Sequence, residues 1–382
     1  MTTALTTPRL TLSRVHPPTL HTIPDAIGAN VERIRSATDA RIMAVVKADG
    51  YGLGAVTVAL AAIAAGAEWL GITDAEDAAP LRAAGVEVPI LAWLNPAGVD
   101  VAQVVADRVD LAVGSVEELR QLIADASALP NGCVRVHLHM DTGMSRGGVP
   151  LEDWAELLRV ARTGRDSGRA RIDVVGVMGH LPDADAADPA KNAPAVLRMR
   201  QARDAVLRAG FGPLLVHLAA TSGTLTDAAT HFDMVRVGAG LVGIDPSETV
   251  PLQGAARLTA SVVHSSVVPA GTAIGYGGAY ATTRTSHLSV IGVGYADGIP
   301  RELGAGAGVA VDGIRCPIVG RVSMDQIVID TGDLSTPRGT TAVVFGPEGG
   351  AVPSMQEWAR WAGSIPHTVV TGIGSRVERA IA

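Results

Sequence analysis

The sequence predicts an α/β domain joined to a β domain: an N-terminal, TIM-like (β/α)8 barrel and a C-terminal, mainly-β domain. Its 382 residues exceed what a typical single hydrophobic core organises, so two domains are expected. Eight short apolar runs alternate with helix-like segments in the first part, which is the pattern of a barrel of parallel strands. After about residue 250, short strand-like runs separated by Gly, Pro and Asp turns replace this alternation. A doubly wound open sheet is the alternative for the first part.

The individual elements follow from local patterns. Residues 1–20 are expected to form an irregular arm that packs with the C-terminal domain, with a strand near 9–15. The barrel is assigned residues 21–249, and apolar residues at helical spacing predict its first helix over 23–34. Its strands are expected at 41–47, 68–73, 88–94, 109–113, 133–139, 172–179, 214–218 and 233–237. Its further helices are expected at 55–65, 74–84, 116–126, 154–162 and 194–208.

The β domain is assigned residues 250–382. Its strands are expected at 257–268, 287–293, 308–311, 317–319, 326–330 and 340–345, with one helix near 354–362.

Composition and charge narrow the function classes. The formal net charge is −7 and Lys and Arg are scattered, so neither a nucleic acid nor an acidic membrane is an expected partner, and a small molecule is favoured. The two cysteines form no C-x-x-C pair and no disulfide framework, which is typical of a reducing compartment. The first 20 residues lack the apolar stretch of a signal peptide, and the longest apolar run is too short to span a bilayer. A cytoplasmic protein is therefore expected.

The segment around Lys47 is the central candidate for chemistry. Lys47 follows a branched apolar run and precedes Gly50, Gly52 and Gly54. A lysine at the carboxyl end of a parallel strand stands where α/β proteins hold their reacting groups, and nearby glycines let a ligand approach the backbone. The alternative is a lysine that ends a strand and reaches solvent. This segment alone leaves both interpretations open.

Other strand ends carry further polar candidates. Arg146 lies among glycines after the strand at 133–139 and could clamp a carboxylate or phosphate, although an exposed arginine in a turn is the alternative. His180 and His217 close two successive strands, where hydrogen-bonded core histidines are common. His137 and His139 place two imidazoles on one strand face. Without a suitable third ligand nearby, no metal site is expected.

Two loops after the last two barrel strands favour a phosphate. Gly238 and Gly240 follow the eighth strand, and the hydroxyls of Thr221 and Ser222 follow the seventh. Barrels commonly bind phosphate at this place through backbone N–H groups at the start of a short helix.

Three of the four tyrosines, Tyr276, Tyr280 and Tyr295, lie in glycine-rich turns of the β domain. Hairpin packing is one explanation. The other is catalysis, because a phenol is one of the few side chains that can act as a base opposite a lysine.

Together these motifs resemble those of the alanine racemase family, fold-type III enzymes that use pyridoxal 5′-phosphate. The similarity runs from about Ile23 to about Val377, nearly the whole chain. The motifs are Ala44-Val-Val-Lys47-Ala-x-x-Tyr51-Gly, Asp141-Thr-Gly-Met-x-Arg146, Arg236-x-Gly238, Gly275-Tyr276-Gly, Gly294-Tyr295-Ala-Asp-Gly and Gly320-Arg321-x-x-Met324-Asp325-Gln326.

The resemblance implies pyridoxal 5′-phosphate as cofactor, an amino-acid substrate, D-alanine biosynthesis, and a homodimer whose sites combine residues of both subunits. Lys47 would bind the cofactor covalently, and Tyr276 of the partner subunit would be the second catalytic acid/base. The other implied cofactor ligands are Tyr51, Arg146, His180, Ser222, Arg236, Gly238 and Ala239, with Arg236 facing the pyridine nitrogen. Arg146 and the backbone at Met324 would bind the substrate carboxylate. The implied entryway residues are Asp185, Tyr295, Arg301, Arg321 and His367.

Racemisation needs one base on each face of the substrate, which the lysine and the tyrosine would supply. A free tyrosine has a pKa near 10, so its phenolate needs stabilisation. Arg146, Arg236 and His180 are the expected sources.

Several positions depart from the family pattern. His367 stands where a tyrosine usually packs beside the catalytic tyrosine, His139 where many members have a carbamylated lysine, and Leu53 where histidine is usual. Because His367 changes the pocket wall, racemisation of a larger amino acid is an alternative to alanine. A non-catalytic cofactor carrier and a fold-type III decarboxylase are weaker alternatives.

Overall fold

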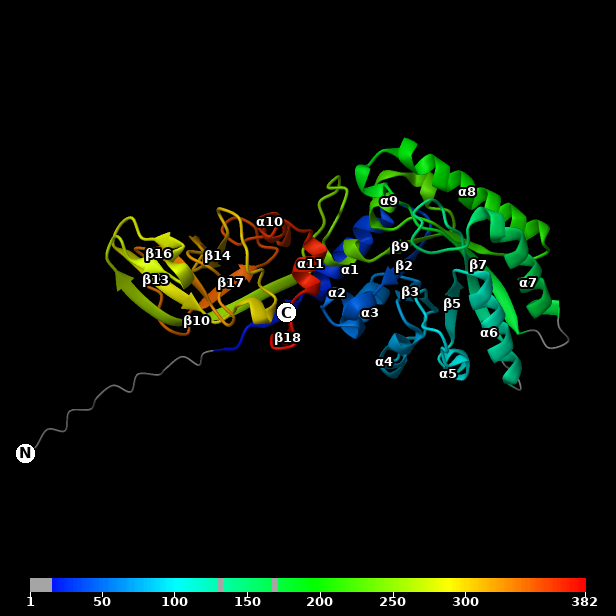
Figure 1. The fold of residues 1–382 in the computed structure, drawn as a ribbon, viewed down its shortest axis with the longest axis horizontal. Helices are drawn as coiled ribbons and strands as arrows, with labels where there is room; N and C mark the ends of the chain where they lie inside the picture. The colour runs from blue at the N-terminus through cyan, green and yellow to red at the C-terminus, as the bar shows by residue number, and fades with distance from the viewer. Residues whose placement is uncertain (1–15, 130–132, 167–170) are drawn as a thin grey trace, which may run out of the picture. The chain divides into compact units, whose positions relative to one another are not determined.

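The computed structural model describes residues 16–129, 133–166 and 171–382 (Figure 1). The chain divides into two compact units. One comprises Ile23–Ala255, and the other comprises residues 16–22 together with Ala256–Ala382. The strand expected near 9–15 lies outside the described residues.

The unit Ile23–Ala255 is built on eight parallel strands. They are β2 (Arg41–Val45), β3 (Trp69–Ile72), β4 (Ile90–Ala92), β5 (Val109–Val113), β6 (Val134–His139), β7 (Ile172–Met178), β8 (Leu215–His217) and β9 (Met234–Val237). The spatial order is β8-β7-β6-β5-β4-β3-β2-β9, so the last strand lies beside the first. Backbone N–H groups of Asp233 and Arg236 donate to the carbonyls of Val216 and Ala219, each at 3.0 Å, and link β9 to β8.

The strands thus form a nearly closed barrel, as predicted. An open doubly wound sheet reverses its strand order near the middle, whereas here chain order and spatial order agree until β9 meets β2. The barrel interior is packed by buried side chains from alternate strand positions. One cluster contains Met43, Trp69, Leu91, Ala112, Met178 and Met234.

Helices surround these strands (Figure 1). They are α1 (Pro24–Arg35), α3 (Ala55–Ala64), α4 (Ala78–Ala83), α5 (Val101–Ala106), α6 (Val116–Ala128), α7 (Trp154–Asp166), α8 (Pro189–Arg208) and α9 (Thr221–Thr226). The expected start of α8 at Pro194 is wrong. Asp188 caps the helix by accepting from the N–H of Ala190 at 3.0 Å, and Pro189 takes the first helical position, where a missing N–H costs nothing.

The second unit is mainly β. Its larger sheet contains β1 (Thr19–Thr22), β10 (Ala256–Val268), β13 (Ser286–Ile291), β14 (Gly308–Val311), β15 (Ile314–Pro317), β16 (Ile327–Gly332), β17 (Thr341–Phe345) and β18 (Glu378–Ile381). A two-stranded sheet pairs β11 (Ala273–Ile274) with β12 (Tyr280–Ala281). β1 pairs with β10 antiparallel and with β18 parallel, so both ends of the described chain lie in this sheet.

Two expectations for this unit are wrong. Besides α10 (Met355–Trp361), a second helix α11 (Pro366–Thr371) is present, and it begins with a proline in its first turn. The strand expected at 317–319 is β15, which starts earlier because it pairs with β14 across a tight turn at Asp312 and Gly313.

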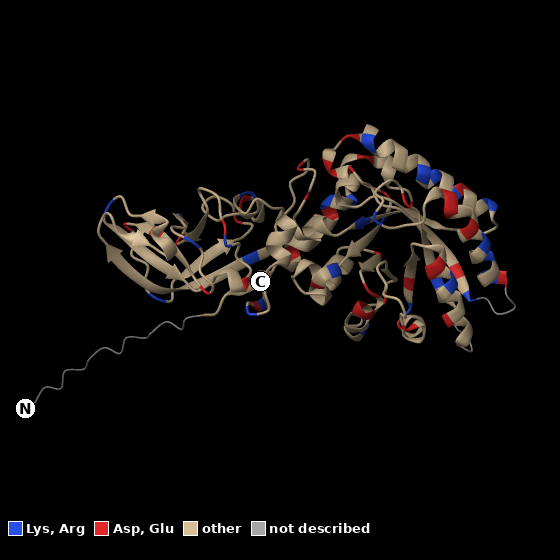
Figure 2. Ribbon diagram, in the orientation of Figure 1, with Lys and Arg blue, Asp and Glu red and all other residues tan. Residues whose placement is uncertain are grey.

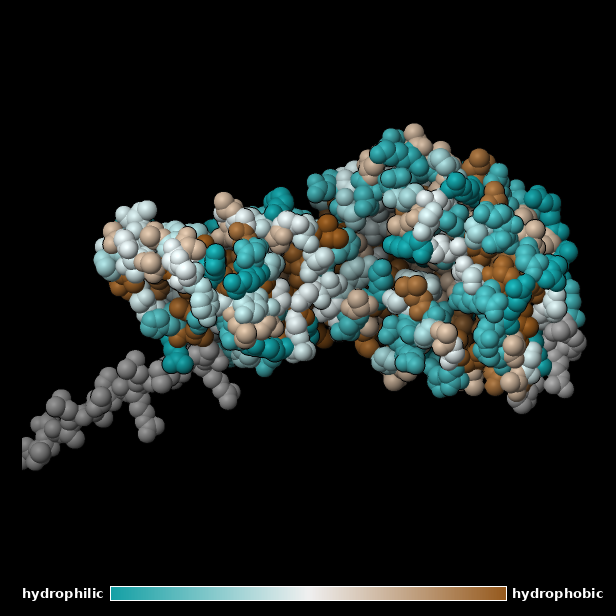
Figure 3. All heavy atoms as spheres, in the orientation of Figure 1, coloured by the Kyte–Doolittle hydropathy of each residue, from teal (hydrophilic) through white to brown (hydrophobic). Residues whose placement is uncertain are grey.

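Lys and Arg residues alternate with Asp and Glu residues along the helices of the barrel (Figure 2). Hydrophilic and hydrophobic residues are likewise mixed on the face drawn in Figure 3. Among the described residues, no helix combines the length and the apolar composition that a membrane span requires.

Candidate active site

Lys47 sits in a sharply turned segment at the carboxyl end of β2. The strand ends at Val45, two positions earlier than expected, and α2 (Lys47–Tyr51) follows. Ala48, Asp49 and Tyr51 all have positive φ, of 52°, 53° and 60°. Such backbone costs a residue with a side chain of order 1–3 kcal/mol, and it is found preferentially at functional sites. The turn fixes the direction in which Lys47 leaves the barrel.

Two arginines lie within electrostatic reach of Lys47. Burial lowers the pKa of its amine, and the positive charges of Arg146 and Arg236 lower it further. A larger share of the amine is therefore unprotonated and nucleophilic near neutral pH. The structure brings together the three cations that the motifs singled out.

The Arg146 loop is held by hydrogen bonds of its own backbone. Asp141 Oδ1 accepts from the N–H groups of Gly143 and Ser145 at 2.9 and 3.1 Å. The Thr142 hydroxyl donates to the carbonyl of His180 at 2.6 Å and accepts from its N–H at 3.1 Å, which ties this loop to the end of β7. Arg146 itself is exposed, and among the described residues no carboxylate lies within 4 Å of it. Its guanidinium is thus available for a carboxylate ligand.

Arg236 is buried in the barrel, where its guanidinium is held by many acceptors. Nη1 donates to the carbonyl of His217 and to its Nδ1, each at 3.0 Å. Nη2 donates to the carbonyls of Gly179 and Leu218 at 2.7 and 3.2 Å and to Nδ1 of His180 at 3.2 Å. Burial lowers the Arg236 pKa to about 10, so the group remains charged. Within the described residues, its Nε has no hydrogen-bond partner.

The loops expected to bind phosphate adjoin one another. The N–H of Gly240 donates to Thr221 Oγ1 at 3.1 Å, which joins the loops after β8 and β9. A Cβ on Gly238 would overlap the hydroxyl of Tyr51. The Tyr51 phenol therefore packs against the backbone of Gly238, where no side chain stands between them. Burial raises the Tyr51 pKa to about 12, which keeps it a neutral hydrogen-bond donor. The helix α9 begins here without a side-chain cap from the described residues.

Ser222 and Asp185 have a contact that the motifs did not indicate. The Ser222 hydroxyl donates to Asp185 Oδ1 at 2.7 Å. Asp185, expected in the entryway, thus contacts a loop of the barrel unit that is expected to bind phosphate. A phosphate at Ser222 would meet its backbone N–H or compete with this carboxylate for the hydroxyl.

The remaining expected residues lie in the second unit, around η6 (Tyr276–Gly278) and η7 (Tyr295–Asp297). N–H groups of Tyr295 and Ala296 donate to the carbonyls of Ser323 and Met324 at 3.0 and 2.9 Å. The guanidinium of Arg301 lies 5.7 Å from the centre of the Tyr295 ring. Both glycines beside Tyr276 approach Arg321. This unit therefore brings Tyr276, Tyr295, Arg301, Arg321 and Met324 to neighbouring turns.

Tyr276 and Met324 are exposed in the single chain, by 65% and 52% of their surface. His367 is half-buried on α11. The Met324 carbonyl already accepts from Ala296, so the group it can offer to a carboxylate is its N–H.

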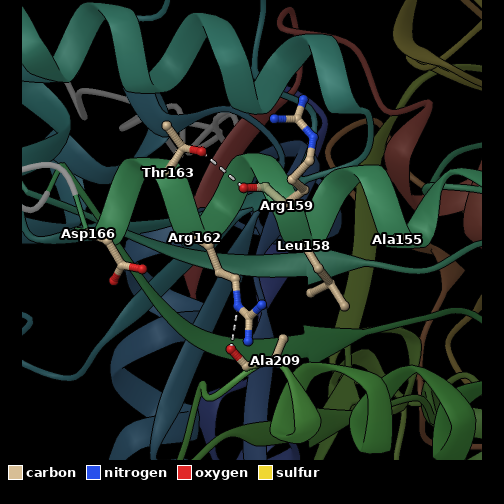
Figure 4. Close-up of a pocket in the computed structure, with 7 residues that line it drawn as sticks. All are labelled: Ala155, Leu158, Arg159, Arg162, Thr163, Asp166 and Ala209. Carbon is tan, nitrogen blue, oxygen red and sulfur yellow. Dashed lines mark hydrogen bonds between the residues drawn. The ribbon is translucent and has the colours of Figure 1, made fainter.

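A separate hollow lies beside α7 (Figure 4). It is lined by Ala155, Leu158, Arg159, Arg162, Thr163, Asp166 and Ala209. It contains none of the expected site residues, and Arg162 Nε already donates to the carbonyl of Ala209 at 2.8 Å. We place no chemistry there.

Comparison with known proteins decides the family. A model of the alanine racemase N-terminal domain matches residues 24–246, and a model of the alanine racemase C-terminal domain matches residues 255–381. The chain belongs to the alanine racemase family. It is therefore an amino-acid racemase, an isomerase.

Relatives in this family match over nearly their whole length. Alanine racemase from Salinispora tropica is 40% identical over 358 residues, which are 93% of this chain and 95% of that protein. The structure of alanine racemase from Streptomyces lavendulae has a TM-score of 0.92 at 34% identity and covers 97% of this chain and 98% of its own. A structure from Bartonella henselae, with covalently bound pyridoxal phosphate, has a TM-score of 0.83 at 28% identity, with 96% and 100% coverage.

The residues of this racemase fit pyridoxal phosphate. The cofactor carries an aldehyde, a phosphate, a phenolic oxygen and a ring nitrogen. The chain offers an amine of lowered pKa at Lys47 and an unpartnered N–H at Arg236 Nε. It also offers the Tyr51–Gly238 cradle beside the uncapped start of α9. Each donor type matches one group of the cofactor.

The Tyr51–Gly238 cradle gives a first testable prediction. Replacing Gly238 with alanine should weaken cofactor binding about tenfold, because the new Cβ displaces the Tyr51 hydroxyl. Fluorescence titration of the apoprotein with pyridoxal phosphate measures this. Gly28→Ala on α1 is the matched control, because its Cβ meets only Ala65 at 3.9 Å. Equal affinity of the two variants would exclude the cradle.

The site histidines predict how the stability of the apoprotein depends on pH. Burial, followed by the charges of Arg236 and Arg146, lowers the pKa of His180 to about 3 and that of His139 to about 4. When the pH falls below about 6.5, the usual pKa of histidine, these side chains bind a proton in the unfolded chain but stay neutral in the folded chain, so the folded state loses stability. Each histidine should then remove about 1.4 kcal/mol of unfolding free energy per pH unit. Urea unfolding between pH 7 and 4 tests this, and an unchanged slope in His180→Gln would contradict it.

Proposed function

We propose that this protein interconverts L- and D-alanine with pyridoxal 5′-phosphate as cofactor. The observation that carries the proposal is the cluster of Lys47, Arg146 and Arg236 at the carboxyl end of the barrel, in a chain that both alanine racemase models match. Small-molecule chemistry in barrels takes place at this end. The protein is expected to act in the cytoplasm and to supply D-alanine, and the free thiols of Cys133 and Cys316 accord with a reducing compartment.

When bound, the cofactor supplies an electron sink that eases removal of the substrate's Cα proton. Lys47 would bind it covalently, and Tyr51, Ser222, Gly238 and Ala239 would hold its phosphate. Arg236 would donate its Nε–H to the ring nitrogen without giving the proton away, because a guanidinium remains protonated. This arrangement limits the electron sink and suppresses side reactions such as transamination.

Two groups would exchange the Cα proton. The Lys47 amine, whose pKa is lowered by burial and by the charges of Arg146 and Arg236, takes or returns the proton on one face of the substrate. The phenol of Tyr276 of the partner subunit serves the other face. We infer a homodimer because Tyr276 and Met324, both expected at the substrate, are exposed in the single chain. Arg146 and the Met324 N–H would hold the substrate carboxylate.

Substrate choice is the direct test. Purified protein incubated with each of a panel of L-amino acids, followed by chiral chromatography, should produce D-alanine faster than any other D-amino acid. Faster turnover of a larger side chain would instead favour the wider pocket that His367 could create. Carbon dioxide release would indicate a decarboxylase, and no turnover at all a carrier.

A further inference from the structure

A row of buried polar side chains crosses the inside of the barrel and ends at Arg236. Asp110 on β5, His137 on β6 and His217 on β8 are at most 2% exposed. Asp110 Oδ2 lies 3.3 Å from His137 Nε2, and His137 Nδ1 lies 2.8 Å from His217 Nε2. His217 Nδ1 then accepts from Arg236 Nη1 at 3.0 Å. We call Asp110, His137, His217 and Arg236 the barrel relay.

The strand geometry builds this relay. Asp110 lies two residues before Ala112, so both side chains point into the barrel, and Ala112 is the ladder partner of His137. A register shift between β6 and β7 sets Gly176 beside His137, and a Cβ there would overlap the imidazole. The Trp69 ring contacts His137 edge-on at 5.7 Å. The backbone thus makes room for an imidazole inside an otherwise apolar core.

The two ends of the relay allow only one direction of hydrogen bonding. A guanidinium has no acceptor, so His217 Nδ1 must be unprotonated and its Nε2 must carry the proton. That proton is donated to His137 Nδ1, which leaves the His137 proton on Nε2, facing Asp110. An ionised carboxylate has no donor and therefore requires the same arrangement. Both imidazoles are neutral Nε2–H tautomers.

The relay also links Arg236 to an acidic group. Arg236 is a buried cation, and among the described residues no carboxylate lies within 4 Å of it. Asp110 is the acidic group connected to Arg236 through hydrogen bonds. Its other oxygen accepts from Arg135 Nε at 2.9 Å, so Asp110 already has an ion-pair partner, and its link to Arg236 orients the guanidinium and does not neutralise it.

We propose that Asp110 is a positioning residue for Arg236, which it orients through the fixed tautomers of His137 and His217. The bonds to Nη1 hold the guanidinium plane, and in that plane the Nε–H would be offered to the cofactor ring nitrogen. The effect on the cofactor rests on the proposed function, whereas the tautomers of the relay do not.

Nitrogen-15 NMR of the histidine rings in the apoprotein tests the relay without any variant. His137 and His217 should each show a protonated Nε2 and an unprotonated Nδ1. A cationic ring or a protonated Nδ1 in either residue would overturn the proposal. This outcome is independent of racemisation, so it separates failure of the relay from failure of the proposed function.

Asp110→Asn tests the consequence. The amide keeps the shape but can donate as well as accept, so the tautomers are no longer fixed from this end. We expect altered ring ¹⁵N shifts of His137 and His217, a changed absorbance spectrum of the bound cofactor, and kcat for L-alanine lower by about tenfold to a hundredfold. Glu118→Gln is the matched control, because this barrel carboxylate accepts from the Gly114 N–H at 2.7 Å and lies outside the relay. Unchanged ring shifts in Asp110→Asn, or equal effects in both variants, would refute the assignment.

Discussion

Replacing Lys47 with alanine should abolish racemisation, with kcat lower by at least about a thousandfold. The variant loses the covalent anchor of the cofactor and one of the two proton-transfer groups together. The chain contains only two lysines, Lys47 and Lys191, which makes the test unusually clean. Lys191→Ala is the matched control, because this residue is exposed on α8 and its loss should leave activity unchanged.

A chemical experiment checks the same assignment. Borohydride reduction of the holoenzyme should attach the cofactor permanently to the peptide that contains Lys47, as read by mass spectrometry. Attachment to the Lys191 peptide alone, or full activity of Lys47→Ala, would contradict the role of Lys47.

Tyr276→Phe should lower kcat for racemisation by about a hundredfold to a thousandfold while leaving cofactor binding intact. The phenyl ring keeps the packing of the turn and removes only the group that moves a proton. In deuterated water, the variant should still exchange the Cα proton of one alanine enantiomer, because Lys47 continues to serve its face.

The control for Tyr276 lies in the same hairpin. Tyr280→Phe removes a phenol from β12 that has no assigned role, and it should retain wild-type kcat. If Tyr276→Phe racemises alanine as fast as Tyr280→Phe does, the phenol is not the second base.

The barrel was predictable because its signal is local and repeated. Eight apolar runs at regular spacing predict parallel strands whatever the details of their ends. The conformation of the turn at Lys47 is harder to predict from the sequence. Neither Ala48 nor Asp49 is a residue type that predicts a left-handed backbone. Both adopt this conformation because the surrounding fold imposes it. The apolar pattern therefore predicts a strand that continues to Lys47, whereas β2 ends at Val45.

Non-local pairings explain what was missed in the second unit. β18 has little apolar pattern, and it forms because it pairs with β1 from the opposite end of the chain. α11 is a single short helix that begins with a proline, and it contains too few residues to show a helical periodicity.

The site shows the same division between local and non-local information. The motifs identified Lys47, Arg146 and Arg236, and the structure places both arginines within electrostatic reach of Lys47. For His137 the sequence predicts only that no metal site forms, because it does not show which side chain the imidazole meets in space. An acidic residue inside the apolar run of β5 was the available signal for Asp110, but its link to His137 depends on the register between neighbouring strands.

The central claim is that each active site joins Lys47 of one subunit to Tyr276 of the other, and subunit complementation tests it most directly. Lys47→Ala and Tyr276→Phe proteins, each inactive alone, are co-expressed and the mixed dimers assayed with L-alanine. Random assembly makes about half of the dimers mixed, each with one intact shared site, so about a quarter of wild-type activity should return. No activity above that of the separate variants would mean that both groups act within one chain, and would contradict the account.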